Sequence, residues 1–181
     1  MSRLKIKGFG QIELNQVAFR RDGRIEAQCK LDAEDFAEVP AENGMLLAVD
    51  NVKRVVKFAT DDSLPIALNY TAEHMYDERA NALKDFKLER DSFLPRLGYL
   101  SVGDKFTTNC VSYEEWSSDD ELKEALKAEN LEVTPAYGGI SADGSILVSS
   151  AKPEAGPVLL VVAGTTMPDG QFGIKFQALK A

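Results

Sequence analysis

Three clusters of neighbouring carboxylates have the residue types that could do chemistry in this chain. They are Asp61-Asp62, Glu114-Glu115 and Asp119-Asp120-Glu121. Two facing acids can hydrolyse a glycosidic bond, and three can hold a divalent cation. Acids that are only adjacent in sequence do neither, because this chemistry requires them to converge in space. The first cluster is also typical of a turn and the last of a helix N-terminus.

We therefore expect no catalytic residue and no metal site, and we expect that the protein is not an enzyme. The alternative is a carboxylate-based hydrolase that uses Glu114, Glu115 or Asp119. The single histidine, His74, lies in a polar run, and no Gly-x-Ser-x-Gly motif supplies a nucleophile for it.

The remaining candidate groups also favour structural roles. Cys29 and Cys110 stand in separate apolar-alternating segments, which predicts two buried free thiols and poor ligands for zinc. Gly138-Gly139 lack the Lys-Ser/Thr ending of a phosphate loop and predict a loop before a hairpin. We expect no cofactor.

The charge balance narrows the classes of partner. The chain has 21 basic and 29 acidic residues, a net charge of −8, which repels nucleic-acid phosphates. Its basic side chains near the start are expected to be the solvated face of two strands: Arg3, Lys5, Lys7, Arg20, Arg21 and Arg24. The longest apolar run, 158–163, is far shorter than the roughly 18 residues of a membrane span, and the first residues lack a signal-peptide core. We expect no nucleic-acid or membrane partner, and synthesis and retention in a cytoplasm.

Strand alternation is the clearest pattern of secondary structure. Apolar residues at every second position predict strands over 25–31, 172–178 and, more briefly, 3–7. In 12–19 the apolar parity changes, which a bulge near Asn15 or Gln16 or two shorter strands would explain. The run 158–163 predicts a buried strand.

Turn residues organise these strands into hairpins. Asp-Gly occurs three times, at Asp22-Gly23, Asp143-Gly144 and Asp169-Gly170, with Asn43-Gly44 as a related pair. We predict one hairpin over 11–31, a second from 45–50 and 54–60, and a third from 158–163 and 171–179.

One helix has a clear start. Ser118 and Glu121 form a capping box, and Leu122, Ala125 and Leu126 form an apolar stripe. We predict that this helix ends near 129–130. A second helix is predicted over 71–85, although this stretch could equally be a long ordered loop.

The expected fold is mostly β (α+β), a hairpin-rich antiparallel domain with one or two short helices. A single domain spans 1–181, with a possible subdivision at the Pro- and Gly-containing loop 152–157. The long segment from Asp61 to Asp85 is a candidate docking or subunit-contact element, since long loops in compact domains are usually functional or disordered.

Three segments resemble head decoration, or capsid cement, proteins of tailed bacteriophages. They are a turn and apolar strand over 42–50, the stretch Lys-Phe-Thr-Thr-Asn at 105–109, and the run Thr-Thr-Met-Pro-Asp-Gly-Gln-Phe-Gly-Ile-Lys-Phe at 165–176. Together they cover about a third of the chain and contain no catalytic motif.

The resemblance implies a virion structural protein that binds the outside of an icosahedral head. Its partner would be the major capsid protein, whose subunit junctions it would hold against internal DNA pressure, and many such proteins act as trimers. It would be made in the host cytoplasm and reside on the capsid surface. The alternative within virions is a tail tube or connector subunit.

Overall fold

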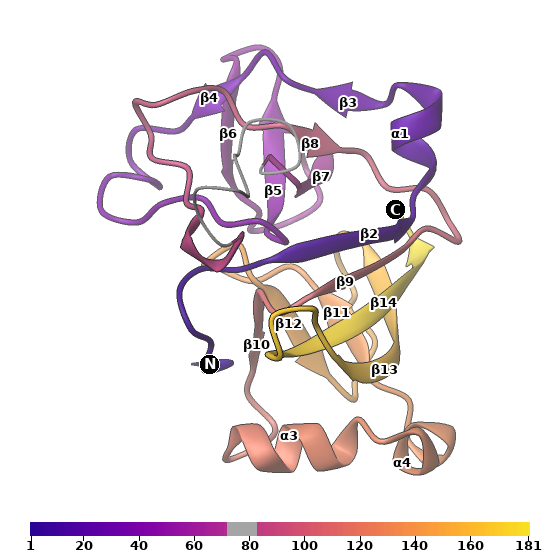
Figure 1. Ribbon diagram of the computed structural model, residues 1–181. Helices are drawn as coiled ribbons and strands as arrows, with labels where there is room; N and C mark the ends of the chain where they lie inside the picture. The colour runs from indigo at the N-terminus through magenta and orange to yellow at the C-terminus, as the bar shows by residue number, and fades with distance from the viewer. Residues whose placement is uncertain (72–82) are drawn as a thin grey trace.

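The strands form two sheets stacked one above the other in the computed structural model, which describes residues 1–71 and 83–181 (Figure 1). The lower sheet has eight strands in the order β1 (Ser2–Arg3), β10 (Val111–Tyr113), β12 (Ile146–Ser149), β11 (Tyr137–Gly139), β13 (Val158–Thr166), β14 (Phe172–Lys180), β9 (Lys105–Thr108) and β2 (Ile12–Gln16). The upper sheet has six, in the order β3 (Ile25–Glu26), β8 (Leu97–Gly98), β7 (Ile66–Asn69), β5 (Leu46–Asp50), β6 (Val55–Phe58) and β4 (Lys30–Leu31).

The mostly β prediction is confirmed, with two departures from it. The pairs β10–β12 and β4–β6 are parallel, so the sheets are mixed instead of purely antiparallel. A parallel pair needs a long connection, and the chain between β10 and β12 includes both helices of the lower end. The described residues contain three short α-helices, one more than the most we predicted: α1 (Ala18–Asp22), α3 (Asp119–Ala125) and α4 (Ala128–Val133).

The C-terminal hairpin is confirmed. β13 pairs antiparallel with β14, and Ile174, Phe176 and Ala178 are fully buried on one face of β14. The turn is shorter than expected because the strands extend beyond their predicted ends. Within this turn, Met167 N donates to Gln171 O at 2.8 Å. The loop 152–157 connects β12 and β13, which belong to the same sheet.

The middle hairpin is confirmed as well. β5 pairs with β6, and Arg54 in the turn has a φ of 57°. β5 is buried on both faces: Leu46 packs into the core between the sheets, whereas Leu47 packs into a second core on the opposite side of the upper sheet. A continuous apolar run suits such a central strand.

The predicted hairpin over 11–31 is wrong. The bulge is present, since the β2–β9 register shifts between Glu13 and Gln16, but the chain then enters α1. α1 buries Phe19 completely against Tyr70, with ring centroids 5.0 Å apart, and Asp22-Gly23 ends this helix. Residues 25–31 then split into β3 and β4, which lie at opposite edges of the upper sheet.

The helix start at Ser118 is confirmed, because Ser118 Oγ accepts from Glu121 N at 3.3 Å. Glu121 returns its carboxylate to Ser117 N at 2.9 Å, one residue earlier than a standard capping box. The helix ends at Ala125, before the predicted 129–130, and α4 follows.

Gly138 and Gly139 lie inside β11, so the loop predicted there is wrong. A Cβ on Gly138 would stand 2.8 Å from the ring of Phe176, which explains glycine in this strand. The helix predicted over 71–85 falls mostly outside the described residues; its end, Leu83–Asp85, is a 3-10 turn, η1. No helix in the described ranges is long and apolar enough to cross a membrane.

Candidate interaction site

The three acidic clusters hold backbone structure. Both carboxylate oxygens of Glu115 accept from Ser150 N, at 2.9 and 3.0 Å. Asp61 Oδ1 accepts from Ser63 N at 2.8 Å in a turn, and this bonding lowers the Asp61 pKa. Across residues 1–71 and 83–181, no group of three or more potential metal ligands converges.

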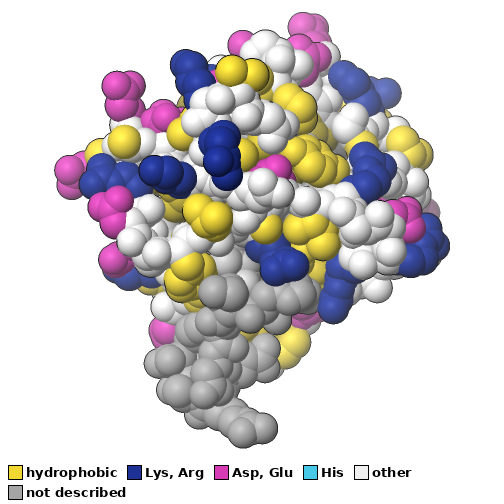
Figure 2. Space-filling view, turned by 90° about the horizontal axis from the view of Figure 1, so that it is seen from above, with side chains coloured by type: hydrophobic (Ala, Val, Ile, Leu, Met, Phe, Trp, Pro, Cys, Tyr) yellow, Lys and Arg dark blue, Asp and Glu magenta, His cyan; other side chains and the backbone are white. Residues whose placement is uncertain are grey.

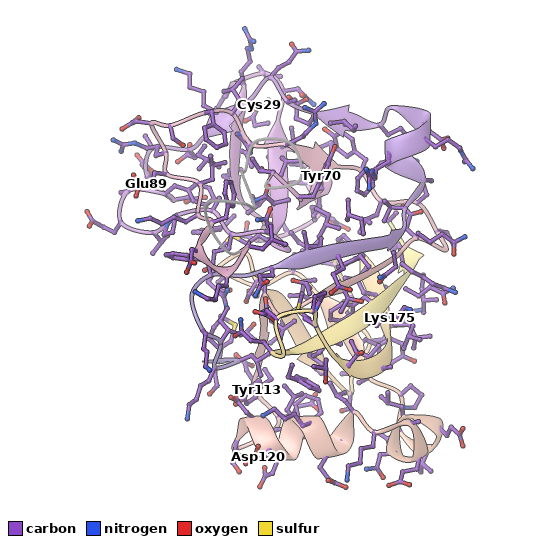
Figure 3. The ribbon with its side chains drawn as sticks, viewed as in Figure 1. Cys29, Tyr70, Glu89, Tyr113, Asp120 and Lys175 are labelled. Atoms are coloured by element: carbon purple, nitrogen blue, oxygen red, sulfur yellow. The ribbon has the colours of Figure 1, made fainter. Side chains whose placement is uncertain are left out.

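Asp119 anchors the start of α3 to the lower sheet. Its Oδ1 accepts from the Tyr113 hydroxyl at 2.6 Å, and its Oδ2 accepts from Lys5 N at 3.1 Å. The hydrogen bond and burial together raise the pKa of Tyr113 to about 12. Figure 3 shows Tyr113 between the sheet and α3, with Asp120 on the outer side of the helix.

Both cysteines are free and buried, as predicted. Burial and a hydrogen bond with Glu26 raise the pKa of the Cys29 thiol to about 11. Burial likewise raises the pKa of Cys110. His74 lies outside the described residues.

An ion pair at the junction of the sheets was missed by the sequence analysis. Arg3 was expected on a solvated strand face, but its Nη2 lies 3.0 Å from Glu42 Oε2 and its Nη1 lies 3.5 Å from Asp143 Oδ2. Nη2 also contacts Cys110 Sγ at 3.3 Å. Burial lowers the Arg3 pKa, but the surrounding Cys110, Glu42 and Asp143 raise it above its ordinary value.

Asp143 extends this junction through a group of serines. Its Oδ1 accepts from Ser145 N at 3.0 Å and from the hydroxyls of Ser141 and Ser145. Ser112 Oγ lies 2.8 Å from Ser145 Oγ, and this hydrogen bond joins β10 to the turn before β12. Burial raises the Asp143 pKa, yet these hydrogen bonds and Arg3 outweigh it and lower the pKa overall. The group stabilises a turn, and we assign it no catalytic role.

The surface most suited to a partner is built by two loops of the upper layer, which we call the loop face. It consists of residues 36–40 and 87–94, and the two loops enclose a cavity of about 520 Å³. Ala41 and Leu88 exchange backbone hydrogen bonds of 2.9 Å, which hold the loops side by side. Figure 3 shows Glu89 at the outer edge of this layer, far from Tyr113.

The loop face carries exposed apolar side chains and charged side chains. Val39, Phe93 and Leu94 are 47%, 36% and 45% exposed, while Phe36, which lines the same cavity as Val39, is buried with its ring centroid 4.7 Å from that of Phe58. Four charged residues of the second loop form two ion pairs, Lys87–Glu89 and Arg90–Asp91. Figure 2 looks down on this layer and shows hydrophobic side chains interspersed with both signs of charge.

The backbone under the loop face is well anchored. Phe58 N donates to Asp35 Oδ2 at 2.7 Å, and Asp32 N donates to Val56 O at 2.8 Å, so the first loop is tied to β6. The only sequence signal for this surface is a set of apolar residues that lies between Pro40 and the acids of the first loop. These residues show no helical or strand periodicity, so the secondary-structure pattern does not reveal them.

The predicted docking segment 61–85 is described only in part. Residues 62–66 lead into β7 and line a cleft with Lys180, whose ammonium lies 4.0 Å from Asp62 Oδ2. Residues 72–82, the middle of that segment, lie outside the described ranges. Comparison of the whole chain with known proteins found no matching family model, no matching curated protein and no matching solved structure.

Proposed function

We propose that this protein is a structural component of a tailed-bacteriophage virion, which binds the outside of the head shell and stabilises it. The observation that carries the proposal is the loop face, where exposed apolar side chains accompany charged ones on an anchored backbone. Exposed apolar side chains together with polar ones are characteristic of protein–protein interfaces. The lack of enzymatic activity remains part of the same prediction.

The resemblance to decoration proteins supports this role, and it lies in residues that build the fold. Its three segments correspond to β5 with its preceding turn, β9, and the β13–β14 turn with β14. They meet in space: Phe106 of β9 packs 5.7 Å from Phe176 of β14, and a Cβ on Gly44 would lie 2.1 Å from Thr108 Oγ1. The residues that carry the resemblance therefore build the junction of the two sheets. Under this proposal, surface loops make the contacts with the partner.

The partner under this proposal is the major capsid protein. The test is co-sedimentation of the purified protein with expanded capsids that lack it. We expect saturable binding at about micromolar concentration, in the range of specific protein interfaces. Recovery of all the protein in the supernatant at that concentration would overturn the proposal.

Two valine variants test separately whether the protein binds the capsid and whether it does so through the loop face. Val39→Asp places a charge on the loop face, whereas Val133→Asp places one on α4 at the opposite end of the molecule (Figure 1). Both valines are exposed, so neither variant should disturb folding. Loss of capsid binding in the first alone supports the loop face; equal binding by both removes that assignment but leaves the virion role intact.

Electron microscopy of the same samples tests the other virion role. Tail tube and connector subunits polymerise into rings, whereas a decoration protein docks on shells. Rings formed by the purified chain alone, without shell binding, would favour the tail component over the decoration protein.

A further inference from the structure

A basic cleft lies on the lower layer of this acidic protein. Its walls come from four separate segments: the N-terminal arm, η1, α3 and the turn between β13 and β14. The cavity is about 430 Å³ and brings together four lysines, Lys5, Lys7, Lys84 and Lys123, beside Asp169 and Phe172. Because the whole chain carries a net charge of −8, four lysines that line one cleft are a local exception.

Two of these lysines are available to a ligand. Lys84 pairs with Asp85 at 2.6 Å and Lys123 pairs with Asp120 at 3.4 Å. Within residues 1–71 and 83–181, Lys5 and Lys7 form no ion pair, and both are exposed. The Asp120 carboxylate is 94% exposed, so its pair with Lys123 is weak and exchangeable.

Asp169 keeps its negative charge in the cleft, but hydrogen bonds hold its carboxylate against the turn. Its Oδ2 accepts from Gln11 Nε2 at 2.7 Å and from Gln171 Nε2, and its Oδ1 accepts from Gln171 N at 3.0 Å. The carboxylate thus serves the turn, and Lys5 and Lys7 are the lysines of the cleft that form no ion pair within the described residues.

The backbone that carries the lysines is fixed before any ligand arrives. Lys5 N donates to Asp119 Oδ2 at 3.1 Å, and Gln171 Nε2 donates to Lys7 O at 3.2 Å. Phe9 N donates to Lys84 O at 2.7 Å, which ties the arm to η1. A fixed backbone lowers the part of the ordering cost of binding that comes from the main chain.

The cleft also offers an apolar surface between its charges. The Lys123 ammonium lies 5.8 Å from the centroid of the half-buried Phe172 ring. A peptide with a few carboxylates and an apolar side chain matches this combination. A nucleic acid matches it less well, because its continuous phosphate backbone would run past Asp85, Asp120 and the acidic remainder of the chain.

We propose that the basic cleft is a docking site for an acidic segment of a partner protein, with Lys5 and Lys7 as its principal carboxylate-binding groups. This inference does not depend on the virion role. It concerns a surface separate from the loop face, so either can fail without the other.

Fluorescence anisotropy with a labelled oligoglutamate peptide tests the proposal. We expect binding that weakens as salt rises to about 0.5 M, where screening acts over only a few ångströms. The double variant Lys5→Gln, Lys7→Gln should weaken binding about three- to tenfold. The matched control Lys53→Gln removes an exposed lysine in the β5–β6 turn and should bind like the wild type.

Further probes decide the chemistry of the ligand. An oligoglutamine peptide of the same length should not bind, and inorganic phosphate should compete only weakly. Equal affinity of the double variant and the Lys53→Gln control would overturn the proposal. Tighter binding of oligothymidylate than of oligoglutamate would overturn it in favour of a nucleic-acid site, and unchanged thermal unfolding of the variants excludes misfolding as the cause.

Discussion

Arg3 Nη2 lies 3.0 Å from Glu42 Oε2, and this ion pair links the edge strand of the lower sheet to the segment that enters β5 of the upper sheet. Glu42 Oε2 also accepts from Gly10 N, so one carboxylate holds two points of the N-terminal arm. The side chains are only 30% and 15% exposed, which places the pair between a surface salt bridge and a buried one.

Removal of Arg3 should therefore destabilise the protein. We expect Arg3→Ala to lower the free energy of unfolding by about 1–3 kcal/mol, because it leaves a shielded carboxylate without its cation. Urea denaturation measures the change. The matched control is Arg21→Ala, whose pair with Asp22 is exposed, so its removal should leave the free energy of unfolding nearly unchanged. Equal costs for the two variants would contradict a structural role for the Arg3–Glu42 pair.

Position 44 requires glycine for two reasons, its positive φ and the lack of space for a Cβ. Gly44 has a φ of 92°, and a Cβ there would lie 2.1 Å from Thr108 Oγ1. Gly170 has a similar φ of 84° with nothing within 4 Å of its Cβ position. We expect Gly170→Ala to cost about 1 kcal/mol for the strained backbone, and Gly44→Ala to cost clearly more. Thermal unfolding of both variants measures the difference, and equal melting temperatures would refute the contact.

Asp143 should make stability depend on acid pH. Its pKa is lowered from the ordinary value of 3.8, so the folded state favours the carboxylate. The stabilisation is thus full above about pH 4 and is lost as the pH falls through the folded pKa below 3.8. Asp143→Asn should lower the melting temperature at neutral pH and converge with the wild type at the acid end.

The exposed Asp120→Asn variant is the control for this experiment. It removes the same charge from the outer side of α3, where no buried network depends on it. Its melting curve should follow the wild type at every pH. A gap between Asp143→Asn and the wild type that stays constant down to the lowest pH would argue against a role for the Asp143 charge.

Both cysteine thiols should be inert in the folded protein. Cys29 is 2% exposed and Cys110 is fully buried, and burial raises the pKa of each. A disulfide-exchange reagent needs a thiolate and access to it. We expect no labelling of the native protein at neutral pH and two labelled thiols per chain in denaturant, as read by mass spectrometry. Rapid labelling of either residue without denaturant would show that its segment opens.

The local sequence pattern was sufficient to predict an element where residues that are neighbours in sequence are also neighbours in space. The hairpins β5–β6 and β13–β14 and the start of α3 were all predicted, because turn residues and a capping serine act over a few positions. The burial of both cysteines followed in the same way from apolar alternation. For the candidate site, the residue pattern predicted structural uses for the carboxylates of the turn at Asp61 and the helix start at Asp119.

Tertiary packing decided the rest. The alternation over 25–31 predicts one strand, yet this segment splits between opposite edges of the upper sheet, and Glu26 Oε1 accepts from Gln28 N and Cys29 N between the two strands. The Arg3–Glu42 pair, the loop face and the basic cleft each join residues far apart in the chain. Such contacts depend on which strand edges meet and which loops cover a core, and these are settled by the burial of distant side chains, which local spacing does not encode. The amino-acid pattern by itself determined a β-rich chain with its main hairpins, and only the folded structure decided which distant segments share a surface.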